Sequence, residues 1–213
     1  RHGVAGVDVT CASELLRHEV GHEEDTVVRL LRAAEEAFGA QGYRDTRLGD
    51  IAGAVGIRRP SLLYYFKTKD RLHAAVVERA FSELRDVVSR SLLSWETVEE
   101  RVEAIATGLS DFANNRPSLV CVIVRQLIAP RSEVREQVVN EFRGLVDTLE
   151  RVYHDLAGDR IPSNFPIRSA ILQIMSGVML RVATAGIEEI WRGADDTRAL
   201  ARTLLIEPLA SRE

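Results

Sequence analysis

The chain has 213 residues, of which 46% are apolar, 28% are charged and 6% are aromatic. This length and apolar content allow a buried core in one compact unit or two small ones. The composition excludes a disordered polymer, a collagen-like repeat and a disulfide-rich scaffold. No apolar run reaches the roughly 18 to 20 residues of a membrane span, and no stretch has the order of a signal peptide. Cys11 and Cys121 are far apart in the sequence, so a cytoplasmic, reduced protein without a membrane partner is expected.

The net charge of −4 is unevenly distributed along the chain. Residues 25–72 carry nine Arg or Lys and six Asp or Glu side chains, an excess of +3, so the rest of the chain carries −7. Lys67 and Lys69 are the only lysines, and both lie in this window. An acidic protein with one basic segment favours a local site for a polyanion.

Apolar residues recur with helical spacing along nearly the whole chain, and no segment alternates with period two. The sequence therefore predicts an all-α fold of about nine helices. Residues 1–24 are poorly patterned and are interpreted as an N-terminal extension with a short helix near Ser13–His18. The next predicted helix ends near Gln41-Gly42. Its apolar stripe comprises Val27, Leu31, Ala34 and Phe38.

Capping residues and stop signals place the remaining helices. Thr46 is expected to cap a short helix, and a long helix is expected to start at Lys69. Thr97 and Glu100 fit a capping box that opens the following helix, and Gly158 is a helix stop. The later helices are predicted over residues 119–127, 132–157, 167–191 and 195–209.

The segment between Thr46 and Lys69 has the features of two short helices joined by a tight turn. Ala52 is small enough for a close contact between helices, and Gly56 tolerates the positive φ that the turn requires. Five apolar residues fall where a helix-turn-helix buries its side chains: Ile51, Val55, Ile57, Leu62 and Tyr65. Residues from about 47 to 66 are therefore predicted to form a helix-turn-helix.

The outward positions of the second helix carry side chains suited to the major groove of DNA. Arginine can bond to O6 and N7 of guanine, and serine and tyrosine can reach base edges or phosphates. Pro60 fits the first helical turn, where a missing N–H costs nothing. Thr46 and Lys69 open flanking helices, whose N-terminal N–H groups favour phosphate oxygens. The predicted DNA-contacting residues are Thr46, Arg47, Arg58, Arg59, Ser61, Tyr64, Tyr65 and Lys69.

This pattern resembles the TetR family of bacterial transcriptional regulators. The family has an apolar helix, then Gly-Tyr-x-x-Thr, Asp-Ile-Ala, a glycine turn, Leu-Tyr-x-Tyr-Phe and a lysine. The matching segments are Leu30–Phe38, Gly42–Thr46, Asp50-Ile51-Ala52, Gly56-Ile57, Leu62–Phe66 and Lys69. Arg58 stands where the family usually has Ser or Thr, and Leu63 stands where Tyr is frequent. The rest of the chain resembles the family only in being helical.

The resemblance implies a DNA-binding domain over residues 25–72 and a regulatory and dimerisation domain over residues 73–213. A homodimer would read the two half-sites of a near-palindromic double-stranded DNA operator. Apolar and small residues of the two C-terminal helices are the predicted interface: Ile171, Ile174, Met175, Gly177, Val178, Leu200 and Leu204. For each of these, packing inside one chain is the alternative.

The resemblance also implies a small-molecule effector. Many aliphatic and few aromatic side chains in the second domain predict an apolar cavity with a few polar groups. The candidates for these polar groups are Arg125, Gln126, His154 and Gln173. A surface position or a satisfied polar group of the core is the alternative for each. The helix that starts at Lys69 joins both domains and is expected to transmit ligand binding to the DNA-binding heads.

Few residues are arranged for catalysis. No His pair with an acid has metal-binding spacing on one helix face, and His18 and His22 lie in the unpatterned extension. There is no phosphate-binding glycine loop or nucleophile elbow, so no enzyme, metal or cofactor is expected. The preferred function is a repressor that a small apolar effector releases from its operator. The alternatives are a DNA-binding regulator that senses a protein partner or no ligand, and a helical enzyme or carrier that contains a helix-turn-helix.

Overall fold

The structure of the chain is a computed structural model. It describes residues 9–93, 96–185, 187, 191, 193 and 195–210, with side chains from residue 25 onward. All regular elements in these residues are helical and none is a strand, which confirms the predicted all-α class. None of the described helices is long and apolar enough to cross a membrane.

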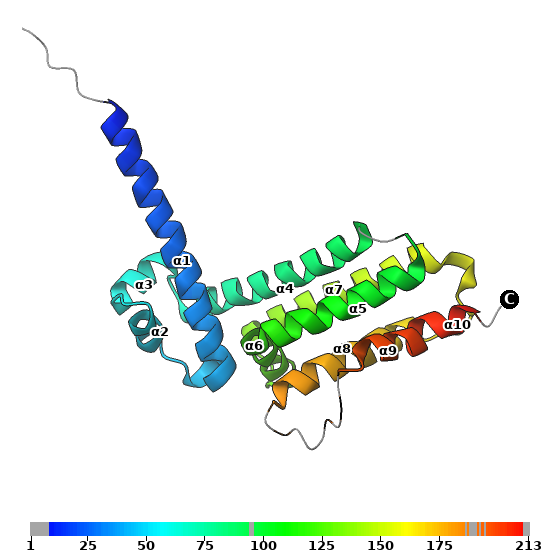
Figure 1. Cartoon of the computed structure of the whole chain (residues 1–213). Coiled ribbons are helices and arrows are strands. Elements are labelled where there is room, and N and C mark those ends of the chain that lie inside the picture. Colours follow the sequence, from blue (N-terminus) through cyan, green and yellow to red (C-terminus); the bar gives the residue numbers. More distant parts are fainter. Residues whose placement is uncertain are drawn as a thin grey trace, which may run out of the picture.

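The N-terminal head consists of three helices, α1 (Val9–Asp45), α2 (Leu48–Ala54) and α3 (Arg59–Tyr65). The short helix expected near Ser13–His18 is part of the long α1, whose first half projects away from the rest of the molecule (Figure 1). The predicted stop at Gly42 corresponds to a kink, because this residue has a φ of 82° inside α1.

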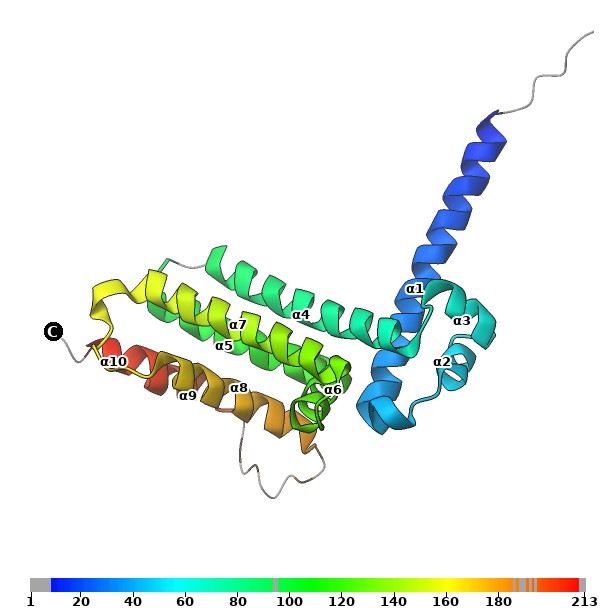
Figure 2. The ribbon, with the colours of Figure 1, turned by 180° about the vertical axis from the view of Figure 1, so that it is seen from behind.

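The remaining helices form an elongated body. Its main helices run side by side, with the shorter α6 at the end that faces α1 (Figures 1 and 2). The elements of the body are α4 (Lys69–Leu93), α5 (Val98–Asn115), α6 (Pro117–Ile128), α7 (Glu133–Ala157), the 3-10 turn η1 (Gly158–Arg160), α8 (Ile167–Ala183), α9 (Thr197–Ala201), η2 (Arg202–Ile206) and α10 (Glu207–Ala210).

Several predicted helix ends are confirmed by their hydrogen bonds. The Thr97 hydroxyl accepts a bond from the Glu100 backbone N–H at 3.2 Å, and the Glu100 carboxylate accepts one from the Thr97 N–H at 3.1 Å. Ser132 accepts a bond from the Arg135 N–H and opens α7. Gly158 follows α7 with a φ of 52°, a conformation that favours glycine.

The prediction of one helix over residues 167–191 is wrong, because α8 ends at Ala183. The Thr184 hydroxyl donates to the carbonyl of Leu180 at 2.7 Å, and the Trp191 indole N–H donates to that hydroxyl at 2.8 Å. Seven residues of continuous helix would separate these two positions by about 10 Å along the axis. Trp191 therefore does not lie on a continuation of α8.

The C-terminal helix predicted over residues 195–209 is a run of α9, η2 and α10. The Asp195 carboxylate accepts a bond from the Thr197 backbone N–H at 3.0 Å near the start of α9. The segment η2 is a π-helical turn just before Pro208. A proline inside a regular α-helix clashes with the carbonyl four residues earlier, and the wider π turn relieves this crowding.

Candidate DNA-binding site and effector cavity

The turn between α2 and α3 is built on Gly56, which has a φ of 77°. The N–H of Ile57 donates to the carbonyl of Ala52 at 3.0 Å, and the N–H of Gly56 donates to Gly53 at 3.0 Å. A Cβ atom at Gly56 would meet nothing within 4 Å. Glycine is therefore favoured here by the backbone conformation and not by a lack of space.

The predicted inner face of the helix-turn-helix packs into the core. Ile51, Val55 and Leu62 are buried, and Ile57 and Tyr65 are half-buried against the same cluster. A contact that the sequence did not reveal fixes the end of α2, where the Arg29 guanidinium donates to the Val55 carbonyl at 2.8 Å. This arginine ties α1 to the turn.

The outer face of α3 carries the predicted groove-reading side chains. Arg58, Arg59, Ser61 and Tyr64 are all exposed, and Tyr64 is 73% exposed although it is a large aromatic residue. The Arg58 carbonyl accepts bonds from the N–H groups of Ser61 and Leu62. Arg58 thus occupies the N-cap position of α3, without a capping side-chain bond, and its side chain faces solvent.

A basic hollow lies where α2, α3 and the start of α4 meet. It has a volume of about 740 Å³, and its charged side chains are Arg47, Asp50, Arg59, Lys67 and Lys69. Four of these five are basic, which favours an anionic ligand. The exposed Lys67 was absent from the predicted contacts, although its position in the basic window was a usable signal.

The prediction that Thr46 caps α2 is wrong. Its side chain is buried, and its hydroxyl lies 2.7 Å from the Gly42 carbonyl and 3.1 Å from the Ala37 carbonyl. Arg47 occupies the N-cap position of α2, without a capping side-chain bond. The hydroxyl of Thr46 thus donates to carbonyls near the end of α1 and is not available to bond a phosphate.

Lys69 has a structural contact in addition to its place in the hollow. Its ammonium donates to the Arg44 carbonyl at 3.1 Å and lies 4.6 Å from the centre of the Tyr43 ring. Burial lowers the pKa of Lys69. The hydroxyl of Tyr43 donates to Asp70, and burial together with this bond raises the pKa of Tyr43 to about 12. Lys69 therefore joins the end of α1 to the start of α4.

Two small apolar cavities lie inside the body. The first holds about 50 Å³ between α5, α7, α8 and the C-terminal helices, and the second holds about 40 Å³ toward α4 and α6. Leu109 and Met175 line both cavities. Tyr153 brings a hydroxyl to the wall of the first, but this hydroxyl donates to the Leu205 carbonyl at 2.7 Å. The cavities are therefore almost entirely apolar.

The predicted polar ligand contacts do not line these cavities. Arg125 donates to the carbonyls of Gly39 and Ala40, both at 3.1 Å, and holds α6 against α1. Gln126 is buried on α6 outside both cavities, whereas His154 and Gln173 are exposed. Helical periodicity identified a mixed helix in each case but not the direction of the polar side chain.

Four of the predicted dimer contacts are core residues of the single chain. Ile171, Ile174, Met175 and Val178 are buried, and all four line one or both cavities. Gly177, Leu200 and Leu204 are half-buried. The opposite face of α8 is exposed, and it comprises Ser169, Gln173, Ser176 and Leu180.

In the described part of the chain, no group of three or more His, Cys, Asp or Glu residues is placed to hold a metal ion.

Comparison with known proteins agrees with this geometry. Residues 30–76 match the family model described as bacterial regulatory proteins, tetR family. An uncharacterized HTH-type transcriptional regulator, YdgC of Bacillus subtilis, is 31% identical over 78 residues, which cover 35% of this chain and 40% of YdgC. The HTH-type transcriptional regulator RutR of Escherichia coli K12 is 40% identical over 50 residues, 24% of each chain. The chain thus matches less than half the length of these two relatives.

Solved structures match over much more of the chain. The fatty acid degradation regulator FadR of Bacillus halodurans superposes with a TM-score of 0.70 at 16% identity. The match covers 88% of this chain and 96% of the FadR chain. A TetR-family transcriptional regulator from Bordetella parapertussis has a TM-score of 0.67 at 18% identity, covering 85% and 93%. At these identities the likeness establishes the fold, both head and body.

Proposed function

We infer that this chain, which belongs to the TetR family of bacterial regulatory proteins, is a sequence-specific DNA-binding transcriptional regulator. The observation that carries this proposal is the outer face of α3, where Arg58, Arg59, Ser61 and Tyr64 are exposed next to a basic hollow. A short helix anchored by the buried Leu62 presents these side chains as a helix-turn-helix presents its recognition helix.

The predicted contacts divide into two groups. Arg58, Arg59, Ser61 and Tyr64 are assigned to base edges and the nearby backbone of the major groove, because they project from α3. Phosphate contacts are assigned to the cations of the hollow, which include Arg47, Lys67 and Lys69. The half-buried Tyr65 supports the neighbouring Tyr64, whose ring meets it edge-on at 5.3 Å. Thr46 contributes through its position at the end of α1 and not through its hydroxyl.

The direct test is selection of duplexes from a random pool with the full chain, followed by a binding titration. We expect a near-palindromic sequence to be enriched. The double variant Arg58→Ala/Arg59→Ala should fold but enrich no sequence, whereas Arg151→Ala, at an exposed position of α7, should select the same sequence as the wild type. A wild-type chain that binds all duplexes equally at every salt concentration would contradict the proposal.

The working unit is proposed to be a homodimer formed on the outer face of α8 and the C-terminal helices. This face has small residues at Ser176 and Gly177, next to Leu180, which is 52% exposed. A Cβ atom at Gly177 would meet nothing within 4 Å in the single chain. Small and apolar residues on two neighbouring helices suit the seam of a four-helix bundle.

The two apolar cavities support a proposal about the effector. Their walls have aliphatic and aromatic side chains and one hydroxyl that is already bonded. The ligand that fits this chemistry is elongated, apolar and uncharged along the buried part, and the repressor would leave its operator when this ligand binds. One similar structure is that of a fatty acid degradation regulator, which is in keeping with an apolar ligand.

The cavity volumes favour a second candidate as well. Drug-sized ligands occupy pockets of about 300 to 1,000 Å³, far above the 50 and 40 Å³ of these cavities. A ligand therefore requires the cavities to merge and expand. If they do not, the alternative is a regulator that senses a protein partner or no ligand.

A further inference from the structure

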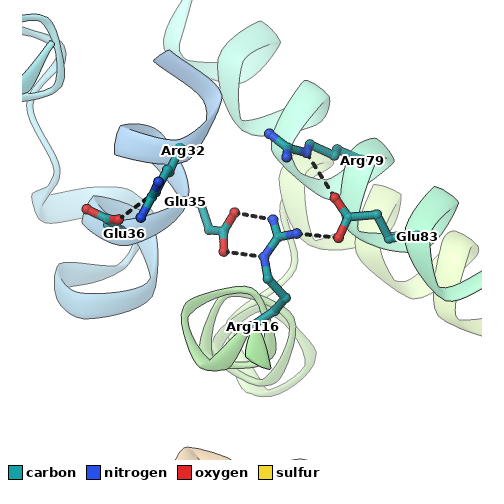
Figure 3. A network of polar contacts seen from close by, with 6 residues as sticks. All are labelled: Arg32, Glu35, Glu36, Arg79, Glu83 and Arg116. Atoms are coloured by element: carbon teal, nitrogen blue, oxygen red, sulfur yellow. Dashed lines mark hydrogen bonds and ion pairs between the residues drawn. The ribbon is translucent and has the colours of Figure 1, made fainter. Parts of the chain in front are cut away.

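A partly buried ion-pair network crosses from the head to the body of the molecule. Glu35 of α1 is only 6% exposed. Its two carboxylate oxygens accept bonds from the Arg116 guanidinium, from Nε at 3.2 Å and from Nη2 at 2.6 Å. The remaining terminal nitrogen of Arg116 donates to Glu83 of α4, which also pairs with Arg79 (Figure 3). A single side chain thus connects three separate elements.

The backbone of Arg116 is itself held in place. It occupies the corner between α5 and α6, where its N–H donates to the Phe112 carbonyl at 2.9 Å and Pro117 begins the next helix. The backbone from which the guanidinium extends is therefore held in one position. A planar guanidinium with two parallel bonds to one carboxylate defines an orientation as well as a distance.

The same side of α1 meets α6 at two further points. The Cβ atom that an alanine would have at Gly39 would lie 2.7 Å from the Ser118 carbonyl oxygen. Arg125, further along α6, donates to the carbonyls of Gly39 and Ala40. The close approach at Gly39 limits translation of α1 along α6, while the Arg116 network sets its position relative to α4.

The network also lies next to the second cavity. Phe112 and Ala113, at the end of α5, and Val120 and Ile123, on α6, line that cavity. These residues flank Arg116 on both sides in the chain. Expansion of the cavity would therefore act on residues that adjoin this corner on both sides.

We propose that Arg116 is a positioning residue for DNA binding, which holds the head at one orientation through Glu35 and Glu83. The charged partner is required because a buried carboxylate is costly without a paired cation. The proposal rests on the DNA-binding function proposed above. It assigns to α6 a share of the coupling that the sequence assigned to α4 alone.

The test measures head orientation without DNA or effector. Spin labels are placed at Ala54→Cys on α2 and Arg151→Cys on α7, both exposed positions, in a chain that also carries Cys11→Ser and Cys121→Ser. Labelled protein is diluted with unlabelled protein so that distances within one chain are measured. We expect one narrow distance in the parent chain and a broadened or shifted distribution in Arg116→Gln.

Two further variants keep the test interpretable. Arg85→Gln breaks an exposed ion pair between α4 and α7 that does not involve the head, and should leave the distribution unchanged. Glu35→Gln removes the charge of the buried carboxylate but retains an amide, so it tests the role even if Arg116→Gln fails to fold; it should also broaden the distribution. Narrow, unshifted distributions in a folded Arg116→Gln or Glu35→Gln chain would overturn the proposal.

The functional readout uses the selected palindrome. Arg116→Gln should bind it roughly 5- to 150-fold more weakly, the usual range of coupling between sites, and should discriminate less between half-site spacings. Its affinity for a single half-site should equal that of the wild type, because no DNA contact is changed. An unchanged spacing preference would contradict the positioning role. Failure of the parent chain to select any sequence would instead contradict the DNA-binding function.

Discussion

Arg59 is the residue whose proposed contact with a base can be tested most directly. It is exposed on α3 and borders the basic hollow. Arg59→Ala should weaken binding to the selected sequence by roughly 1–3 kcal/mol and relax discrimination at one base pair. Lys67→Ala should remove a proposed phosphate contact, so we expect it to weaken binding to all sequences about equally and make the salt dependence shallower. Gel-shift titrations at several salt concentrations distinguish the two patterns. Equal losses on cognate and scrambled duplexes for Arg59→Ala would place this side chain on the phosphate backbone.

His73 predicts a dependence of stability on pH. It is buried, and neither ring nitrogen has a hydrogen-bond partner in the described part of the chain. The centre of its ring lies 5.0 Å from that of Phe38 and 5.3 Å from that of Tyr43, and both contacts are edge-on. Burial lowers the pKa of His73 to about 4, although the nearby Asp70 opposes the shift and Lys69 adds to it.

The direction of the effect follows from the lowered pKa. The unfolded chain binds a proton on His73 near pH 6.5 and the folded chain only near pH 4, so the free energy of unfolding should fall as the pH drops through this window. The contribution is about 2 kcal/mol between pH 7.5 and pH 5. Urea unfolding at both pH values measures it. His73→Phe should remove this part of the dependence, whereas His154→Gln, at an exposed position, should retain it. Identical pH dependence in His73→Phe and the wild type would rule out this account.

At the scale of the elements, replacing each of two glycines of the helix-turn-helix with alanine should change the stability of the chain in opposite directions. Gly56→Ala places a Cβ atom on a residue with a φ of 77°, which should destabilise the chain by roughly 1–2 kcal/mol. Gly53→Ala is the matched control, because Gly53 lies inside α2 and its Cβ atom would also meet nothing within 4 Å. It should stabilise the chain by up to about 1 kcal/mol. Urea unfolding compares the stabilities of the two variants. A Gly56→Ala chain as stable as the wild type would contradict the requirement for glycine at this turn.

Local sequence signals predicted the elements well where the signal and its hydrogen bond lie in the same turn. The capping box at Thr97 and Glu100, the cap at Ser132 and the stop at Gly158 are examples. Thr46 has the residue type of a cap, but its hydroxyl bonds backward to α1. Residue type shows that a hydroxyl can accept or donate, and only the fold decides which backbone group it meets.

Long-range placement was not predictable in the same way. The apolar stripe of α8 was correctly identified as a packing surface, but it packs inside the chain, where Ile171 and Ile174 line a cavity. Periodicity shows that one face of a helix is apolar. It cannot distinguish a face that packs in the core of its own chain from one that packs against a partner subunit. The Trp191 indole donates to Thr184, just after the end of α8, and the Arg116 network joins residues far apart in the sequence. Neither contact produces a local pattern in the sequence from which it could be predicted.

At the scale of the whole molecule, dimer formation can be tested through Gly177. Gly177→Trp should fold, because a Cβ atom at Gly177 would meet nothing within 4 Å in the single chain, but its indole should obstruct the proposed seam. Light scattering at micromolar concentration should find a monomer that binds the palindrome at least about tenfold more weakly, a loss of 1.4 kcal/mol. Gly144→Trp is the matched control, since Gly144 is exposed on α7 with equal space. A dimeric Gly177→Trp chain would place the seam elsewhere.

The effector proposal depends on whether the two cavities act as one site. Met175 and Leu109 separate them, so Met175→Ala should join them into a longer apolar space. In a thermal-shift series with straight-chain alkanols, the chain length that stabilises the protein most should increase in Met175→Ala. It should decrease in Leu109→Phe, which adds volume between the cavities. Leu172→Ala, on α8 outside both cavities, should retain the wild-type optimum.

Binding in the cavity must then be linked to DNA. An alkanol that lowers operator affinity tenfold needs only about 1.4 kcal/mol of coupling, and the operator must weaken alkanol binding by the same factor. Titration of each ligand in the presence and absence of the other measures both sides of this equality. A stabilising alkanol that leaves operator affinity unchanged would show a cavity without a regulatory role. If no alkanol stabilises the wild type or Met175→Ala, the cavities are packing defects, and the regulator senses a protein partner or no ligand.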